Sequence, residues 1–152
     1  MFIRVEVRDA LKAAIEALTT IQVTKGWNAP DSAVEEIFLG PTRGNVTYEV
    51  FLATAMPHDD QFTIDVLLHA ATPGQTQDQA EARIQTMANL IVEALADPTF
   101  NDLTVTNGGV SSAFIFDALL ADSELPETNP IDEGYEAYGS VTVAVHTRGR
   151  YL

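Results

Sequence analysis

The residues with the greatest potential for chemistry in this chain are its three histidines, His58, His69 and His146. Asp59 and Asp60 follow His58, and imidazole and carboxylate groups together are common metal ligands. The run matches no established ligand spacing, however, and it lies in a predicted turn. His69 and His146 fall on the polar sides of two predicted strands and would meet only if those strands were neighbours. We predict solvated sheet-face histidines and no metal site.

A catalytic nucleophile is equally hard to find. The chain has no cysteine, which excludes thiolate chemistry and disulfides. Residues 109–113, Gly-Val-Ser-Ser-Ala, only loosely match the Gly-x-Ser-x-Gly elbow of serine hydrolases, and they lead into a predicted strand rather than a helix. The sequence contains neither a Walker phosphate loop nor a dinucleotide-binding fingerprint. We therefore expect no catalytic residue, no cofactor and no enzymatic activity.

Length and composition describe an ordinary globular domain. The chain has 152 residues, of which 46% are hydrophobic and 20% charged. No stretch approaches the roughly 18 consecutive apolar residues of a membrane helix. Charged residues also interrupt the N-terminal segment that a signal peptide would keep apolar. We expect a single domain, residues 1–152, that stays inside the cell that makes it and has no membrane partner.

The charge of the chain is unevenly distributed. The formal net charge is −14, and between Arg83 and Arg148 there are ten acidic residues but no lysine or arginine. Such a surface repels nucleic acid. The basic residues gather mainly near the two ends of the chain. Two interpretations stay open: the acids provide solubility, or the basic ends contact acidic patches of neighbouring subunits.

Residues 62–70 and 77–96 have the clearest secondary-structure patterns. In 62–70 apolar and polar residues alternate, which is typical of a strand with one buried face. In 77–96 the apolar spacing is helical, Thr76 and Gln79 have the spacing of a capping box, and Pro98 follows the end. Because each element has one apolar side, each must bury that side against another element.

Weaker patterns predict the remaining elements. A helix is expected at 9–19, and whether it already begins at Ile3 stays open, because Ile3, Val5 and Val7 also alternate like a strand. Strands are expected at 34–39, 45–54, 103–106, 110–119 and 138–147, with a turn at 40–44, a loop around the packing residue Trp27, and an acidic loop or arm at 122–133. This order indicates an α+β domain with a mainly antiparallel sheet and two amphipathic helices packed on one face. The predicted core consists of Leu11, Ile15, Leu18, Phe62, Ile64, Val66, Leu68, Ile84, Met87, Ile91, Val143 and Val145.

The order of these elements resembles that of a known family. An amphipathic helix is followed by a Gly-Trp-x-x-Pro-like loop at 26–30, a strand–loop–strand, the 62–70 strand with its capped helix, an acidic loop and a final strand with an arginine-containing tail. This layout is similar to that of the tail terminator proteins of long-tailed (siphovirus-type) bacteriophages. The likeness covers nearly the whole chain.

The resemblance implies a structural protein of the virion that is assembled in the host cytoplasm. In that family an α+β domain forms a homohexameric ring at the head-proximal end of the tail tube. The ring ends tube polymerisation and docks to the head-completion (neck) proteins, while DNA passes through its lumen without specific binding. The implied partners are therefore further copies of the chain, the tail tube protein and a neck protein.

Charged residues and one tyrosine, near the chain ends and in the acidic arm, are the predicted contacts between subunits or with the tube. They are Arg4, Arg8, Asp122, Glu124, Glu127, Asp132, Glu133, Arg148, Arg150 and Tyr151. The short basic tail at 148–152 is the strongest candidate, and a frayed terminus is its alternative. The arm has few apolar groups to offset the entropy of ordering it, so we expect it to be mobile until a neighbour binds.

Other functions stay open at this point. Head-closure, minor tail and tail tube proteins of phages share a similar size and layout. Two alternatives belong to other classes: a small ligand-binding or enzymatic α+β domain with a pocket between helices and sheet, and a bacterial adaptor that pairs through an edge strand.

Overall fold

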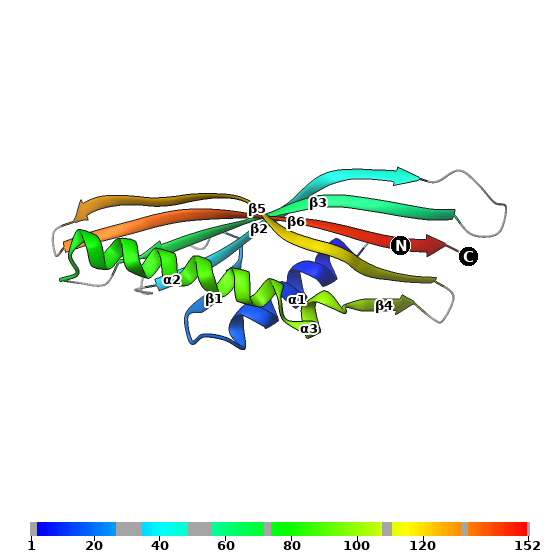
Figure 1. Cartoon of the computed structure of the whole chain (residues 1–152), viewed down its shortest axis with the longest axis horizontal. Helices are drawn as coiled ribbons and strands as arrows, with labels where there is room; N and C mark the ends of the chain where they lie inside the picture. Colours follow the sequence, from blue (N-terminus) through cyan, green and yellow to red (C-terminus); the bar gives the residue numbers. More distant parts are fainter. Residues whose placement is uncertain are drawn as a thin grey trace.

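The computed structural model describes residues 3–26, 35–48, 56–71, 74–107, 111–131 and 134–151. Within them the helices are α1 (Arg4–Glu16), α2 (Gln77–Leu95) and α3 (Pro98–Asn101). The strands are β1 (Gln22–Lys25), β2 (Glu35–Tyr48), β3 (Met56–Ala70), β4 (Thr104–Asn107), β5 (Ser111–Ile131) and β6 (Gly134–Tyr151). Figure 1 shows them as an elongated, twisted sheet with the helices along its lower side.

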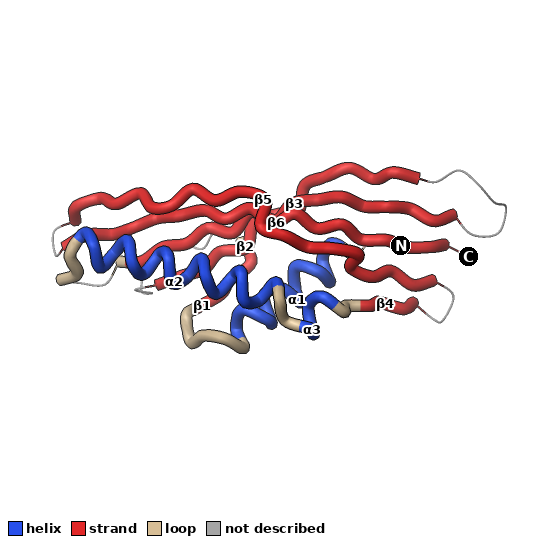
Figure 2. Tube along the Cα trace, in the orientation of Figure 1, coloured by secondary structure: helices blue, strands red, loops and turns tan. Residues whose placement is uncertain are grey.

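One six-stranded sheet, in the order β1-β2-β3-β6-β5-β4, organises the domain. β1 pairs with β2 in parallel, and the other four pairings are antiparallel. The prediction of a mixed domain with a mainly antiparallel sheet is therefore confirmed. The long strands β2, β3, β5 and β6 extend over most of the length of the molecule (Figure 2).

α2 forms where the sequence predicts it, because its start is fixed locally. The Thr76 side chain accepts a hydrogen bond from the backbone N–H of Gln79, and the Gln79 side chain accepts one from the Thr76 N–H, which confirms the capping box. The apolar side of α2 is buried, and the helix contacts β3, β5 and β6. Asp97 then caps the short helix α3, which the sequence analysis missed.

α1 begins at Arg4, so the helix includes the N-terminal residues whose assignment to helix or strand the sequence left open. Ile3, Val7 and Leu11 are fully buried whereas Val5 is exposed, so the apolar period at this end of the chain is helical and not strand-like. α1 contacts α2, β1 and β2. The helix ends at Glu16, and Leu18 beyond it is 41% exposed. The placement of Leu18 in the core was therefore wrong, whereas the other eleven predicted core residues are all buried.

β2 is continuous through residues 40–44, where the sequence analysis expected a turn. The two glycines of this segment allow close approach to β3 rather than a reversal of the chain. A Cβ on Gly44 would overlap the carbonyl oxygen of Gln61, and one on Gly40 would lie 3.0 Å from the carbonyl oxygen of Asp65. A register shift between Leu39 and Thr42 absorbs the intervening residues as a bulge. Of the strand predicted at 45–54, residues 49–54 lie outside the described residues, as does Trp27.

The segment expected to be an acidic loop or arm is the second half of β5. Its residues from Asp122 to Ile131 pair with β6, and β6 itself runs from Gly134 to Tyr151 rather than over 138–147. Three register shifts interrupt the β5–β6 pairing, and Pro126 lies within one of them. Proline is compatible with this strand because an edge strand needs ladder hydrogen bonds on one side only. The expectation of a loop was therefore wrong for residues 122–131, and residues 132 and 133 lie outside the described residues.

Candidate functional site

The structure gives Asp59 and Asp60 different partners. All three residues lie in β3, not in a turn. Asp60 bonds to Arg4 on the helix-covered side of the sheet, whereas Asp59 bonds to Arg148. Successive residues of a strand point to opposite faces, so the two carboxylates cannot serve one ion. Among the residues that the structure describes, no group of three or more histidine, aspartate or glutamate side chains could hold a metal.

His69 is buried rather than solvated, which corrects the prediction. Its ring stacks on Tyr138 with the centroids 4.6 Å apart, and Nε2 lies 3.3 Å from the carboxylate of Glu136. Burial and the nearby Glu136 carboxylate raise the pKa of the Tyr138 hydroxyl. β3 and β6 are neighbours, but the two histidines do not meet, because His69 pairs with Tyr138 whereas His146 pairs with Gln61.

Arg4 connects the start of α1 to β3. Its Nε and Nη2 donate to the two carboxylate oxygens of Asp60 at 2.7 and 2.6 Å, and the guanidinium lies 5.3 Å from the centre of the Phe62 ring. The Asp60 side chain is fully buried. The hydrogen bond to Asp60 raises the pKa of Arg4 above its ordinary value. Arg4, predicted as a subunit contact, thus has a structural partner in its own chain.

The predicted basic tail is the last part of β6. Arg148 donates from Nε to Asp59 at 2.9 Å, and Nε2 of His146 lies 3.4 Å from the same oxygen. The hydrogen bond from Arg148 is the main reason that the pKa of Asp59 is lowered. The backbones of Arg150 and Tyr151 continue the pairing with β3. A separate tail that starts at residue 148 was therefore a wrong expectation.

The other predicted interface residues are spread over the sheet. Arg8 donates to the carbonyl oxygen of Gly40 at 3.4 Å. The acidic residues of β5 have the following register partners on β6: Asp122 pairs with Thr142, Glu124 with Ser140 and Glu127 with Tyr138. Asp132 and Glu133 lie outside the described residues. Of the predicted contacts, the side chains of Arg4, Arg8 and Arg148 are described, and they lie on two different elements, α1 and β6.

Two long sheet edges are the feature that the sequence analysis missed. β1 pairs with β2 only along Glu36–Leu39, and β4 pairs with β5 only along Ser111–Phe114. Within the described ranges, residues 40–48 of β2 and residues 115–131 of β5 therefore have a neighbouring strand on one side only. Apart from the Gly40 carbonyl, which accepts from Arg8, and the Ile115 N–H, which donates to the Leu103 carbonyl, such edges offer unpaired backbone groups to another chain. No local sequence signal could have revealed them, because they follow from the shortness of β1 and β4.

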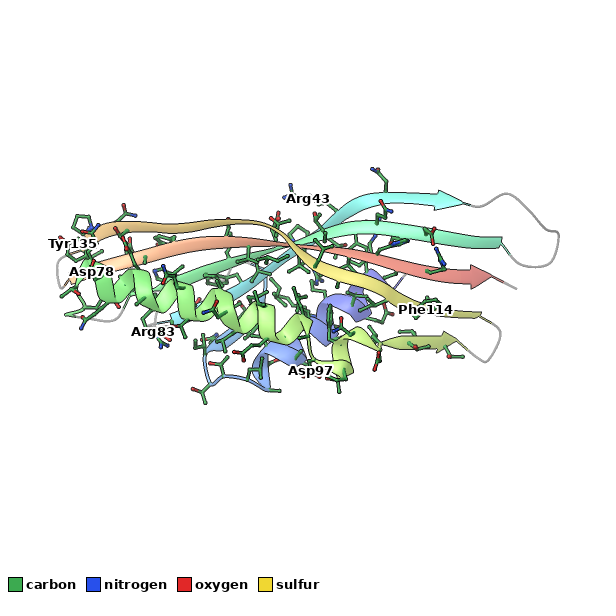
Figure 3. The ribbon with its side chains drawn as sticks, viewed as in Figure 1. Arg43, Asp78, Arg83, Asp97, Phe114 and Tyr135 are labelled. Atoms are coloured by element: carbon green, nitrogen blue, oxygen red, sulfur yellow. The ribbon has the colours of Figure 1, made fainter. Side chains whose placement is uncertain are left out.

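A shallow hollow of about 450 Å³ lies beside the β2 edge. It is lined by Arg43, Gly44, Asn45, Gln61, Phe62, Thr63, Ala144, Val145 and His146. Arg43 is exposed and projects from the side of the sheet that faces away from the helices (Figure 3). The hollow therefore offers a guanidinium and two amide side chains, Asn45 and Gln61, at an open edge.

The comparisons with known proteins add no identity. No known protein family matches the sequence, and no curated protein matches it either. Of the helices in the described residues, none has the length and apolar character needed to span a membrane. Function must therefore be inferred from the order of the elements, the two sheet edges and the charge.

Proposed function

We propose that the chain is a structural protein of a long-tailed phage that forms a ring at the head-proximal end of the tail, where it ends tube polymerisation and docks to the neck proteins. The order of the elements supports the proposal: a helix, strands, the capped α2 and further strands follow one another as in the tail terminator resemblance. The ring would be a homohexamer, as in that family. α1 and α2 would together cover one face of each subunit's sheet.

The observation that carries the ring proposal is the presence of two different open edges at opposite sides of one sheet. The 40–48 edge lies on β2 and the 115–131 edge on β5, with β3 and β6 between them. A contact between two different surfaces is heterologous, and repeated copies of such a contact close into a ring when the rotation between subunits permits it.

Strand direction is compatible with this contact. β2, β3, β6 and β5 alternate in direction, so β2 and β5 run antiparallel to each other. If neighbouring copies are related by a rotation about an axis parallel to the strands, every strand keeps its direction. β5 of one copy can then lie beside β2 of the next, and these two strands are antiparallel. Antiparallel pairing between the copies would then continue the sheet from subunit to subunit.

The net charge is consistent with a DNA conduit. Each copy carries −14, and β5 and β6 contain no lysine or arginine before Arg148. A lumen with few cationic groups would make few phosphate contacts and would let DNA slide. The same charge opposes assembly, so the ring would need specific favourable contacts between copies. We propose no catalytic activity and no cofactor.

Solution mass and electron microscopy test the proposal. The purified chain should elute with a mass of roughly six times the 16.5 kDa of one copy, and negative-stain images should show rings. Disruption of the gene in the parent phage should give tails of abnormal length. Long tubes from the purified chain would identify a tail tube protein instead, and a strict monomer at all concentrations would contradict any ring.

A further inference from the structure

Arg43 differs from the other arginines whose side chains the structure describes, because it has no hydrogen-bond or ion-pair partner among the described residues. Arg4, Arg83 and Arg148 each bond to a carboxylate, and Arg8 donates to the carbonyl of Gly40. For Arg43 the structure gives neither a hydrogen bond nor an ion pair with any described residue. An exposed guanidinium in a chain of net charge −14 could easily have found an acid, so its lack of a partner within the described residues points to one from outside.

The surroundings of Arg43 suit a carboxylate. Asn45 and Gln61 line the same hollow and can each donate from a side-chain amide. Gly44 contributes no side chain, and Thr63 is the register partner of Arg43 on β3. A planar guanidinium binds carboxylates through two parallel hydrogen bonds, which gives both strength and orientation.

Acidic residues concentrate on the opposite edge of the same sheet. Residues 115–131 of β5 contain Asp117, Asp122, Glu124 and Glu127 but no base, whereas residues 40–48 of β2 contain Arg43 and no acid. The two open edges of one molecule therefore carry opposite charge. This complementarity favours a second copy of the chain as the partner.

The register of the strands within the sheet indicates which acidic residues of β5 could lie near Arg43 of a neighbouring copy. Across the sheet, Arg43 pairs with Thr63, Thr63 with Ala144, and Ala144 with Leu119. Asp117 and Asp122 lie two cross-strand rows to either side of Leu119, because their β6 partners, His146 and Thr142, are each two residues from Ala144. If the next copy continues the sheet in line, its Arg43 would lie opposite Leu119 and diagonal to both acids. Diagonal neighbours are within reach of long side chains.

We propose that Arg43 of one copy binds between Asp117 and Asp122 of the next and thereby fixes the contact between the β2 and β5 edges. This inference rests on the proposed ring. The ion pairs would offset part of the repulsion between acidic subunits, and their position would set which residues of the two edges pair.

Charge reversal tests this contact. R43E should raise the concentration at which rings assemble by at least about tenfold, while thermal unfolding of the monomer stays unchanged. K12E is the control for net charge, because Lys12 is a partly buried base on α1 rather than on a sheet edge, and its partner Glu16 lies on the same helix. The double variant D117R/D122R should weaken assembly in the same way as R43E. The triple variant R43E/D117R/D122R should form rings again, because both sides of the contact are reversed in charge.

The outcomes separate the two proposals. Rings from the wild type but not from R43E, with restoration by the triple variant, support the contact. Rings from R43E at the wild-type concentration, or equal weakening by K12E, would overturn the Arg43 contact while the ring itself stands. If R43E weakens ring assembly and the triple variant does not restore it, the partner of Arg43 is not on β5, and the proposed contact is wrong. If the wild-type chain forms no ring, the proposed function itself is contradicted.

Discussion

Arg4, the first residue of α1, holds the fully buried carboxylate of Asp60 on β3 with two hydrogen bonds of 2.7 and 2.6 Å. The pair fastens the N-terminal helix to the centre of the sheet. Bidentate geometry and burial distinguish it from the exposed pair between Lys12 and Glu16 on the same helix. The desolvated Asp60 charge is stabilised mainly by this one guanidinium, so the two residues act as a unit.

Removal of Arg4 should therefore destabilise the domain strongly. R4A leaves the buried Asp60 charge without its partner, and we expect the free energy of unfolding to fall by about 3–5 kcal/mol. K12A removes an exposed i,i+4 pair and should cost less than about 0.5 kcal/mol. Urea denaturation of the two variants checks the prediction. Equal small losses would mean that Asp60 finds another partner.

The ion pair between Arg148 and Asp59 should make stability depend on pH. Because the folded pKa of Asp59 is lowered, its contribution is present above the unfolded pKa of about 4 and is lost as the pH falls through the folded value. Both side chains are partly exposed, so D59N should cost only about 1 kcal/mol at pH 7. The difference from wild type should shrink below pH 4 in denaturation curves measured across pH. A constant difference would show that the Asp59 charge does not matter.

The orientation of α2 can be tested with two adjacent residues. Ile91 is fully buried whereas Val92 is 48% exposed. I91A should lower the free energy of unfolding by about 2–5 kcal/mol, because it leaves a cavity between α2 and the sheet. V92A, a smaller truncation on the exposed side, should cost less than about 0.5 kcal/mol. Similar costs for the two variants would mean that the buried side of α2 has been assigned wrongly.

The pairing of β5 with β6 predicts resistance to proteolysis. Glu124 and Glu127 lie in β5, whose backbone is paired with β6. Cleavage after either residue by a Glu-specific protease requires local opening of the strand, so it should be slow even in the free chain. Mass spectrometry of timed digests measures the rate, and the urea-unfolded chain provides the reference. Rapid cleavage of the native chain at these two residues would favour the mobile arm that the sequence suggested.

Parts of this fold were determined by the sequence alone because their signals are local. The capping box of Thr76 and Gln79 and the helical spacing up to Leu95 lie within a few residues of the bonds they predict. The alternation from Phe62 to Ala70 likewise specified a one-faced strand, and its apolar residues are buried as expected. Local rules predicted these elements because each needs only its own residues and one apolar surface to pack against.

Only the tertiary structure decided how far the long strands extend and which charges meet. Gly44 suggested a turn, yet its lack of a side chain permits close contact with β3. The acidic, proline-containing run after Asp122 suggested a loop, yet β6 supplies the partners for its backbone. Arg4 and Asp60 are 56 residues apart. Strand pairing and ion pairs depend on groups distant in sequence, so local patterns could not predict them.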